Sequence, residues 1–264
     1  MSHVHYLDVP GRGDCLPRDD EFASTFAAYE DTQKVYPRSD WDGLLASHVG
    51  LETLVKKIKN QGQEGSCASN ATGQCLEVAW NMAYGPQHWI EFSPISIYRW
   101  VAEGPGSGST ISGNLRQLRD VGMLPVATDP SKAILRAAGL PDSHVLTATG
   151  YHQSFPAGWQ ATARFFRAAE WYDISSFEGF VSAILEGFPV CYGRAGHAIC
   201  GVRVVKRNSA WTIKYANSWG DWGEDGYGYD SESYISGSIR SYGAWALRCP
   251  ILTDEFLALT ETTQ

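Results

Sequence analysis

The sequence predicts an α+β protein with two lobes, and the distribution of its hydrophobic patterns points to this class. Helical patterns, with apolar residues every three or four positions, fill the first half of the chain. Alternating patterns typical of strands fill the second half. Because helices and strands are segregated along the chain, we expect an N-terminal arm (residues 1–35), a mainly helical lobe (36–140) and a mainly β lobe (141–264). Functional sites commonly form where two such lobes meet.

The strongest helix signal runs from Cys67 to Tyr84. Gly85 and Pro86 follow it directly and should end the helix. The apolar positions that repeat at helical spacing are Ala68, Ala71, Cys75, Val78 and Met82.

Weaker signals predict further helices and one loop. Most of these helices begin at a capping residue or end at a glycine. Helices are expected at residues 52–59, 115–122 and 131–139. Another helix should begin with Ser93 as cap and Pro94 at its first position, and one more should run from the capping box Ser175–Glu178 to Gly187. A flexible loop of glycine and serine is expected at 104–109.

Three strands are predicted in the second half. They cover residues 189–192, 197–205 and 211–217, with a turn at 206–210 between the last two. In the last strand Trp211, Ile213 and Tyr215 alternate with more polar or smaller residues, as expected for a half-buried strand.

Composition and charge exclude several classes of function. The chain has 264 residues, 44% of them hydrophobic, and a formal net charge of -8. An acidic surface repels a phosphate backbone, so we expect no nucleic-acid partner. The N-terminus has no basic region followed by an apolar stretch, and no run of 18 apolar residues exists. We therefore expect no signal peptide, no transmembrane segment and a cytoplasmic or virion-associated protein.

The six cysteines argue against a metal centre. They are far apart and form no CxxC pair, so we predict no metal and no cofactor. If Cys67 is a free nucleophile, five cysteines remain and at least one more must be unpaired. This count favours a reducing compartment.

Cys67 has the setting of a reactive thiol. Gly65 and Ser66 lead directly into the helix, which places Cys67 in its first turn. The unpaired N–H groups and dipole there favour a thiolate. A small buried hydrophobe is the ordinary fate of a cysteine and remains the alternative.

Three other residues could complete a site around Cys67. Of the seven histidines, His197 opens a strand after Gly196 and could serve as the base, although a core histidine is the more common role. Asn217 ends the next strand and could orient the imidazole, or could be a turn asparagine. Gln61 precedes the helix and could donate to an oxyanion, or could be an ordinary surface glutamine.

Taken together, these segments resemble papain-like cysteine peptidases. Residues 60–67 (NQGQEGSC) resemble the family's nucleophile segment, and Gly196-His197-Ala198 its histidine strand. Residues 217–220 (NSWG) and 222–227 (WGEDGY) resemble its asparagine motif, and residues 36–41 the start of its mature chain. The matches follow the family order from about residue 36 to the C-terminus.

The resemblance implies a fold and a set of roles. The fold would be papain-like, with a helical lobe packed on an antiparallel β-barrel-like lobe and the active site in the cleft between them. Cys67 would be the nucleophile, His197 the base and acid, Asn217 its orienter, and Gln61 an oxyanion donor. The substrate would be a peptide or protein. Candidate substrate contacts are Ser66, Gly108, Ala195, Gly196 and Trp219, the last also shielding the Asn–His hydrogen bond.

The chain departs from the family pattern at several positions. Glu64 occupies the place of a disulfide cysteine, and Ala68 that of a bulky aromatic. The loop before His197 is only residues 193–196, which predicts a more open cleft on that side. We expect no long inhibitory prosegment, and the chain resembles compact bacterial and phage members. Residues 1–35 would then be an arm on the surface, which we favour, or a short plug over the cleft.

Two alternatives to a peptidase are open at this point. One is another Cys-His enzyme, such as a transglutaminase-like acyltransferase or a cell-wall amidase, although the spacing of Gln61 and Cys67 and the NSWG motif disfavour it. The other is a catalytically silent structural or binding protein, for instance in a virion, although none of the four site residues is lost. Neither the substrate's side-chain preference nor the oligomeric state can be predicted.

Overall fold

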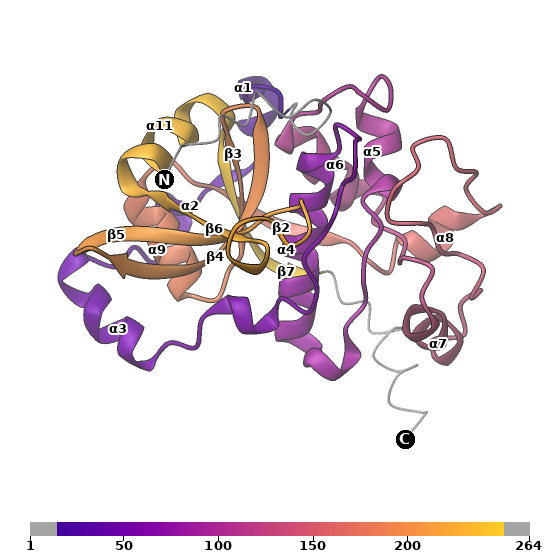
Figure 1. Ribbon diagram of the computed structural model, residues 1–264, viewed down its shortest axis with the longest axis horizontal. Helices are drawn as coiled ribbons and strands as arrows, with labels where there is room; N and C mark the ends of the chain where they lie inside the picture. Colours follow the sequence, from indigo (N-terminus) through magenta and orange to yellow (C-terminus); the bar gives the residue numbers. More distant parts are fainter. Residues whose placement is uncertain (1–14, 251–264) are drawn as a thin grey trace.

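The computed structural model describes residues 15–250, and these form two halves joined by one central helix. Figure 1 shows the β-sheet with helices α3, α9 and α11 in one half and helices α5 to α8 in the other, with α4 between them. The longer helices are α3 (Trp41–Ser47), α4 (Cys67–Tyr84), α5 (Ile95–Val101), α6 (Ile111–Asp120), α7 (Asp129–Ala137), α8 (Trp159–Ala163), α9 (Phe177–Leu185) and α11 (Glu232–Tyr242). Single turns are α1 (Asp20–Ala23), α2 (Tyr29–Thr32) and α10 (Trp222–Asp225), with 3-10 turns η2 (Arg38–Asp40), η3 (Leu51–Leu54) and η4 (Pro86–His88).

A seven-stranded sheet carries the second half of the chain. Its spatial order is β1-β2-β7-β3-β4-β5-β6, and every neighbouring pair is antiparallel except β1 with β2. The strands are β1 (Ala27–Ala28), β2 (Ala168–Asp173), β3 (Val190–Arg194), β4 (His197–Arg207), β5 (Ala210–Ala216), β6 (Tyr227–Ser231) and β7 (Ala244–Pro250). The predicted α+β class is confirmed, with a single parallel pair among the described strands.

Helix α4 is buried along nearly its whole length. Fifteen of its 18 residues are buried, and it packs against β3, β4 and β7 on one side and against α5 and α6 on the other. Such burial requires partners for its polar side chains. Ser69 donates to Asn114 Oδ1, and Asn70 donates to the carbonyl of Ser66. The predicted bounds of this helix, Cys67 to Tyr84, are confirmed, and Gly85 follows with a positive φ of 85°.

The predicted helix at residues 52–59 is wrong beyond its first turn. Only η3 forms, and Val55 is already extended. The lysine side chains at the end of this segment bind partners outside it. Lys57 contacts Glu91, and Lys59 donates to Glu77 and to the carbonyl of Phe92. These tertiary contacts outweigh local helix propensity.

Two predicted helix caps are also wrong. The Ser93 hydroxyl donates to the Thr147 carbonyl instead of capping α5, which begins at Ile95. The cap of α9 is Ser176 rather than Ser175, because the Ser176 hydroxyl accepts from Gly179 N. The expected second half of that capping box does not form, since the Glu178 side chain pairs with Arg38.

The strand hairpins are longer than the sequence predicts. Strand β3 continues to Arg194, and β4 extends to Arg207. Asn208 and Ser209 alone form the turn to β5, both with positive φ, as a tight hairpin turn requires. Strands β1, β2, β6 and β7 and helix α11 were not predicted. Residues 15–35, expected to be irregular, contain α1, β1 and α2, while residues 1–14 lie outside the described part.

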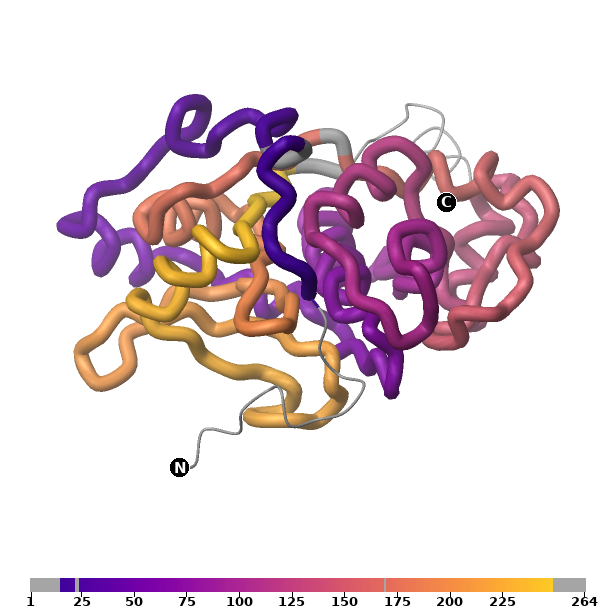
Figure 2. The backbone as a smooth tube through the Cα atoms, turned by 90° about the horizontal axis from the view of Figure 1, so that it is seen from above, coloured from indigo at the N-terminus to yellow at the C-terminus, as the bar shows by residue number. Residues whose placement is uncertain are grey.

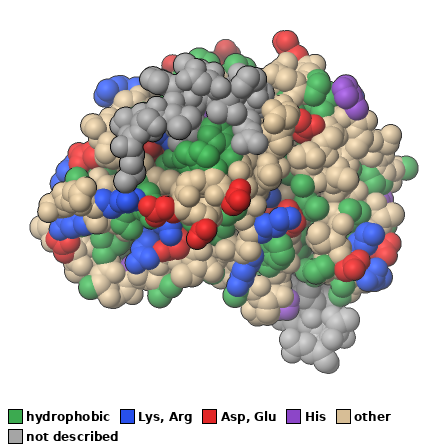
Figure 3. Space-filling view, viewed as in Figure 1, with side chains coloured by type: hydrophobic (Ala, Val, Ile, Leu, Met, Phe, Trp, Pro, Cys, Tyr) green, Lys and Arg blue, Asp and Glu red, His purple; other side chains and the backbone are tan. Residues whose placement is uncertain are grey.

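The charged surface shows no segregation of sign on the face drawn in Figure 3. Basic and acidic side chains are interspersed there. Basic and acidic side chains of the structure also form ion pairs, such as Arg203–Glu52 and Lys206–Asp42. Within residues 15–250, no helix has the length and apolar character needed to cross a membrane.

A buried ion pair supports the segment that leads to Gln61. Lys59 and Glu77 are 4% and 1% exposed, and Lys59 Nζ lies 2.6 Å from Glu77 Oε1. Burial raises the pKa of Glu77, and Lys59 limits that rise. We predict that Lys59→Met lowers the free energy of unfolding by about 3–5 kcal/mol, because it leaves the carboxyl group buried without its cation. Urea unfolding at pH 7 measures this change.

The matched control is Lys206→Met. Lys206 and its partner Asp42 are both exposed, so we expect this change to cost at most about 1 kcal/mol. Equal losses in the two variants would contradict a stabilising role for the buried pair.

Candidate active site

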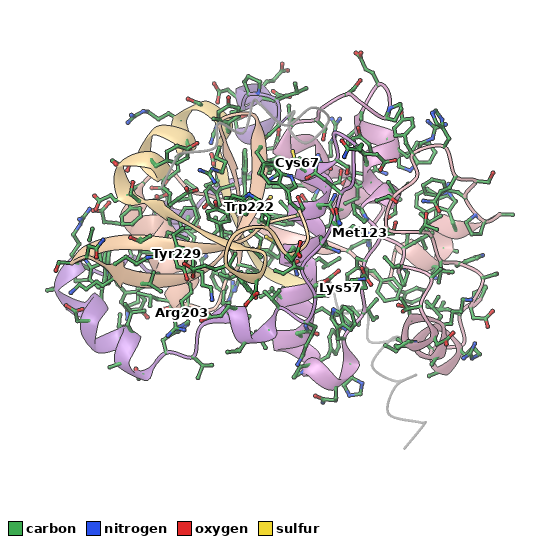
Figure 4. All side chains as sticks on the ribbon, viewed as in Figure 1. Lys57, Cys67, Met123, Arg203, Trp222 and Tyr229 are labelled. Atoms are coloured by element: carbon green, nitrogen blue, oxygen red, sulfur yellow. The ribbon has the colours of Figure 1, made fainter. Side chains whose placement is uncertain are left out.

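Cys67 is the first residue of α4 and is fully buried. Figure 4 shows it near the upper end of this helix, between the two halves of the molecule. The preceding Gly65 packs tightly, since a Cβ there would lie 2.7 Å from the carbonyl oxygen of Ser107 and 3.2 Å from the Tyr98 hydroxyl. A glycine is therefore required for the close approach of this turn to the loop of residues 104–109, which we call the glycine loop.

His197 is the first residue of β4 and is held by Asn217. The two-residue turn Ala195–Gly196 joins β3 to β4, and Arg194 pairs with His197 across the hairpin. We call residues 190–207 the histidine hairpin. His197 Nε2 lies 2.7 Å from Asn217 Oδ1, the distance of a strong hydrogen bond.

The orientation of the Asn217 amide is fixed by its own neighbours. The Ser218 N–H donates to Asn217 Oδ1 at 2.7 Å, which identifies this atom as the oxygen. The Trp219 ring lies 4.6 Å from the His197 ring, tilted by 32°, and covers the His–Asn pair. Trp219 is only 4% exposed, so this hydrogen bond lies in a dry environment.

The electrostatics of His197 favour its neutral form. Burial lowers the pKa of His197 to about 4, the hydrogen bond to Asn217 opposes this, and the nearby Arg194 guanidinium lowers it further. Asn217 Oδ1 can only accept, so Nε2 of the neutral ring must carry the hydrogen. Nδ1 is then the nitrogen with the available lone pair.

Gln61 joins the same hydrogen-bonded chain. It is fully buried, contrary to a surface glutamine, and the Ser218 hydroxyl donates to its Oε1 at 2.6 Å. Its Nε2 donates to the Glu64 carbonyl at 2.8 Å, and its backbone N–H to the Ser218 carbonyl at 2.9 Å. The structure thus connects Gln61, Ser218, Asn217 and His197 in one network. Ser218 was not singled out in the sequence, where its motif signalled only Asn217 and Trp219.

The substrate contacts expected from the sequence have different settings in the structure. Gly196 and Gly108 are half-buried, and Ala195 is exposed at the tip of the histidine hairpin. Ser66 is buried, and both its carbonyl and its hydroxyl accept from Asn70. The Ser66 side chain therefore already has a partner inside the protein.

The N-terminal segment Cys15–Asp19 crosses the molecule at the same place. Cys15 N donates to the Gly196 carbonyl at 2.9 Å, and Leu16 N donates to the Ser109 carbonyl at 3.1 Å. Figure 2 shows this segment between the sheet half and the helical half. The more open side expected from the short loop is therefore covered by the chain itself. No sequence signal marked Cys15 or Ser109 for these contacts.

An ion pair anchors the N-terminal segment. Arg18 donates to both carboxylate oxygens of Asp173 on β2, at 2.7 and 2.5 Å. Its guanidinium also lies 5.5 Å from the Trp245 ring centre, and the backbone N–H of Arg18 donates to the Ser241 carbonyl at 3.0 Å. Both partners of the ion pair are largely buried, and the two parallel contacts make it a bidentate guanidinium–carboxylate pair.

The described His, Cys, Asp and Glu side chains are dispersed. No cluster of three or more His, Cys, Asp or Glu side chains suited to a metal ion occurs among them. The five described cysteines, Cys15, Cys67, Cys75, Cys191 and Cys200, are buried and form no disulfide with one another.

The low pKa of His197 predicts a pH-dependent stability. Between the unfolded value of 6.5 and the folded value of about 4, the unfolded chain binds a proton that folded His197 does not. Stability should therefore fall as the pH falls through this window, by about 3 kcal/mol from this residue, and level off below it. Urea unfolding at pH 7, 5.5 and 4 should show this loss in the wild-type chain.

The variant His197→Gln isolates the contribution of this side chain. Glutamine does not titrate, so the variant should lose about 3 kcal/mol less than the wild-type chain between pH 7 and pH 4. Equal pH dependence in the two proteins would contradict a neutral, buried His197.

Comparison with known proteins defines the fold. No protein-family model and no curated protein matches the chain. Among solved structures, xylellain, a cysteine protease from Xylella fastidiosa, matches with a TM-score of 0.61 at 20% identity, over 91% of this chain and 96% of its own.

Two digestive procathepsins from Tenebrio molitor larval midgut also match. Procathepsin L2 has a TM-score of 0.63 at 16% identity, over 95% of this chain and 81% of its own. Procathepsin L 3 has a TM-score of 0.62 at 17% identity, over 92% of this chain and 76% of its own. The chain therefore has the fold of the papain-like cysteine proteases.

Proposed function

We propose that this chain is a cysteine peptidase that hydrolyses peptide bonds with Cys67, His197, Asn217 and Gln61. The observation that carries the proposal is the His197 Nε2–Asn217 Oδ1 hydrogen bond of 2.7 Å. It leaves Nδ1 as the basic nitrogen of a neutral imidazole, and a base is what a thiol nucleophile requires. The fold shared with solved cysteine proteases supports the same assignment.

The proposed reaction follows from these roles. His197 Nδ1 takes the proton of the Cys67 thiol, and the sulfur attacks the carbonyl carbon of the peptide. The negative oxygen of the tetrahedral intermediate accepts hydrogen bonds from Cys67 N–H and Gln61 Nε2. The amine leaves with the proton from His197, and water then hydrolyses the thioester to release the acid and the free thiol.

The N-terminal segment indicates how a peptide substrate would lie. Its extended backbone donates to the carbonyl oxygens of Gly196 and Ser109. A peptide substrate would use the same two acceptors, because they bind main chain rather than a particular side chain. This proposal retains Gly196 from the sequence-based candidates and replaces Gly108 by its neighbour Ser109. Ala195, exposed at the hairpin tip, would face the solvent side of the bound peptide.

Cys67→Ala is the first test of the proposed function. In a reducing buffer, the wild-type chain should hydrolyse dipeptidyl coumarin substrates and be labelled at Cys67 by an epoxysuccinyl peptide. The variant should lose both hydrolysis and labelling, with a fall in kcat/KM of at least about a thousandfold, because the nucleophile is absent.

Cys75→Ala is the matched control for this test. Cys75 lies on the same helix, is buried, and is no part of the proposed machinery. Its variant should keep labelling and hydrolysis. An unlabelled wild-type chain would favour a silent structural protein, whereas labelling with turnover only of peptidoglycan fragments or of acyl acceptors would favour an amidase or an acyltransferase.

We further propose that the N-terminal segment restricts access to Cys67 and His197, both fully buried with the segment in place. Arg18→Ala removes the bidentate contact with Asp173 and should raise the rate of Cys67 labelling by about tenfold. This rise corresponds to a loss of about 1.4 kcal/mol of the free energy that anchors the segment. Mass spectrometry of the labelled full-length chain measures the rate.

The control for this prediction is Arg136→Ala. Arg136 forms an exposed ion pair with Asp142, both more than 40% exposed, far along the chain from the segment. It should leave the labelling rate unchanged. The same rate in Arg18→Ala and in the wild-type chain would show that the segment is only a surface arm.

A further inference from the structure

Glu64 links the turn that carries Gln61 to a distant loop. Its Oε1 accepts from Gly150 N at 2.9 Å and from Tyr151 N at 2.7 Å, across 86 and 87 positions of sequence. Two N–H donors on one carboxylate oxygen form charge-assisted hydrogen bonds, which are stronger than neutral ones. The Glu64 side chain is thus a cross-link between two segments that share no secondary structure.

The backbone of the same residue holds Gln61. The Glu64 carbonyl accepts from Gln61 Nε2 at 2.8 Å, and Glu64 N donates to the Gln61 carbonyl at 3.3 Å. Gln61 and Glu64 therefore close the turn on each other. Any displacement of Glu64 moves the acceptor that sets the direction of the Gln61 amide.

The loop that receives the carboxylate is itself well fixed. Tyr151 is 5% exposed, its hydroxyl donates to the Ala102 carbonyl at 3.0 Å, and its ring packs edge-on at 5.3 Å against Tyr98. The Tyr98 hydroxyl in turn contacts the carbonyls of Gly104, Pro105 and Ser107 in the glycine loop. Glu64 thus joins the Gln61 turn to a packed structure rather than to a free loop.

We propose that Glu64 is a positioning residue for the oxyanion donor Gln61, through its carboxylate contacts with the backbone of Gly150 and Tyr151. This inference rests on the proposed function. Glu64 itself would make no contact with substrate and transfer no proton. Its effect should appear only in steps that place negative charge on the substrate oxygen, because those steps alone need Gln61 aligned.

Two reagents separate this effect from general damage to the site. The peptide aldehyde acetyl-leucyl-leucyl-norleucinal forms a tetrahedral adduct whose oxygen needs the oxyanion donors. Iodoacetamide alkylates the Cys67 sulfur and forms no such oxygen. In the full-length chain, Glu64→Ala should raise the aldehyde Ki by about 10- to 100-fold and lower kcat with little change in KM, while the alkylation rate stays within about twofold.

The conservative variants test the atoms involved. Glu64→Gln retains an oxygen that accepts both N–H groups and should keep the aldehyde Ki within about threefold of the wild-type value. Glu64→Asp, which shortens the reach by one methylene, should lie between the wild-type chain and Glu64→Ala and provides a milder change if the alanine variant folds poorly. Glu103→Ala, which removes an exposed carboxylate near the glycine loop, is the matched control and should have no effect.

A double variant tests whether Glu64 acts through Gln61. Adding Glu64→Ala to Gln61→Ala should cause little further loss of aldehyde binding, because the donor that Glu64 positions is already gone. Full additivity of the two losses of aldehyde binding would overturn the proposal, as would an unchanged aldehyde Ki in Glu64→Ala. It would also be overturned if Glu64→Gln bound the aldehyde as weakly as Glu64→Ala, or if Glu64→Ala lowered the alkylation rate as much as it lowered aldehyde binding. A wild-type chain that binds no aldehyde and hydrolyses no peptide would overturn the proposed function itself.

Discussion

The burial of helix α4 constrains the rest of this structure. The helix lies between the sheet and the helices of the other half, so both of its sides must be matched by partners. Its first residue is Cys67, and the turn before it passes so close to the glycine loop that position 65 has no space for a side chain. The thiol is therefore placed by the packing of both halves at once, and neither half alone determines its position.

A second constraint is that the large majority of polar groups brought into a buried region have hydrogen-bond partners. Gln61, Asn217 and His197 are all buried, and Ser218 connects them by donating from its hydroxyl to Gln61 and from its N–H to Asn217. One residue thus orients both the proposed oxyanion donor and the residue that holds the proposed base. The amide directions on both sides of the site follow from a single short segment after β5.

Much of this arrangement could be predicted from local sequence, and the remainder depends on contacts distant in sequence. The bounds of α4 followed from its apolar spacing and from Gly85. The alternation at Trp211, Ile213 and Tyr215 placed Asn217 at the end of a strand, which in the structure ends one residue earlier, at Ala216. The helix expected at 52–59 failed because Lys59 finds a buried partner in Glu77. The capping role assigned to Glu178 failed because Arg38 binds it from 140 positions away. The contact between Cys15 and Gly196 joins main-chain atoms, which leave no signature in residue type.

The buried state of His197 also connects access to the site with its chemistry. With the N-terminal segment in place, desolvation lowers the pKa of His197 to about 4, so the imidazole is neutral and the imidazolium of a thiolate pair is disfavoured. On the proposed role of the N-terminal segment in restricting access, its departure would admit water to the histidine hairpin and raise the pKa of His197 above this value. On the proposed function, the movement that admits a peptide would then also make proton transfer from Cys67 more favourable. Arg194, which opposes the imidazolium from the neighbouring strand, would keep that pKa from rising as far as in an open site without a nearby cation.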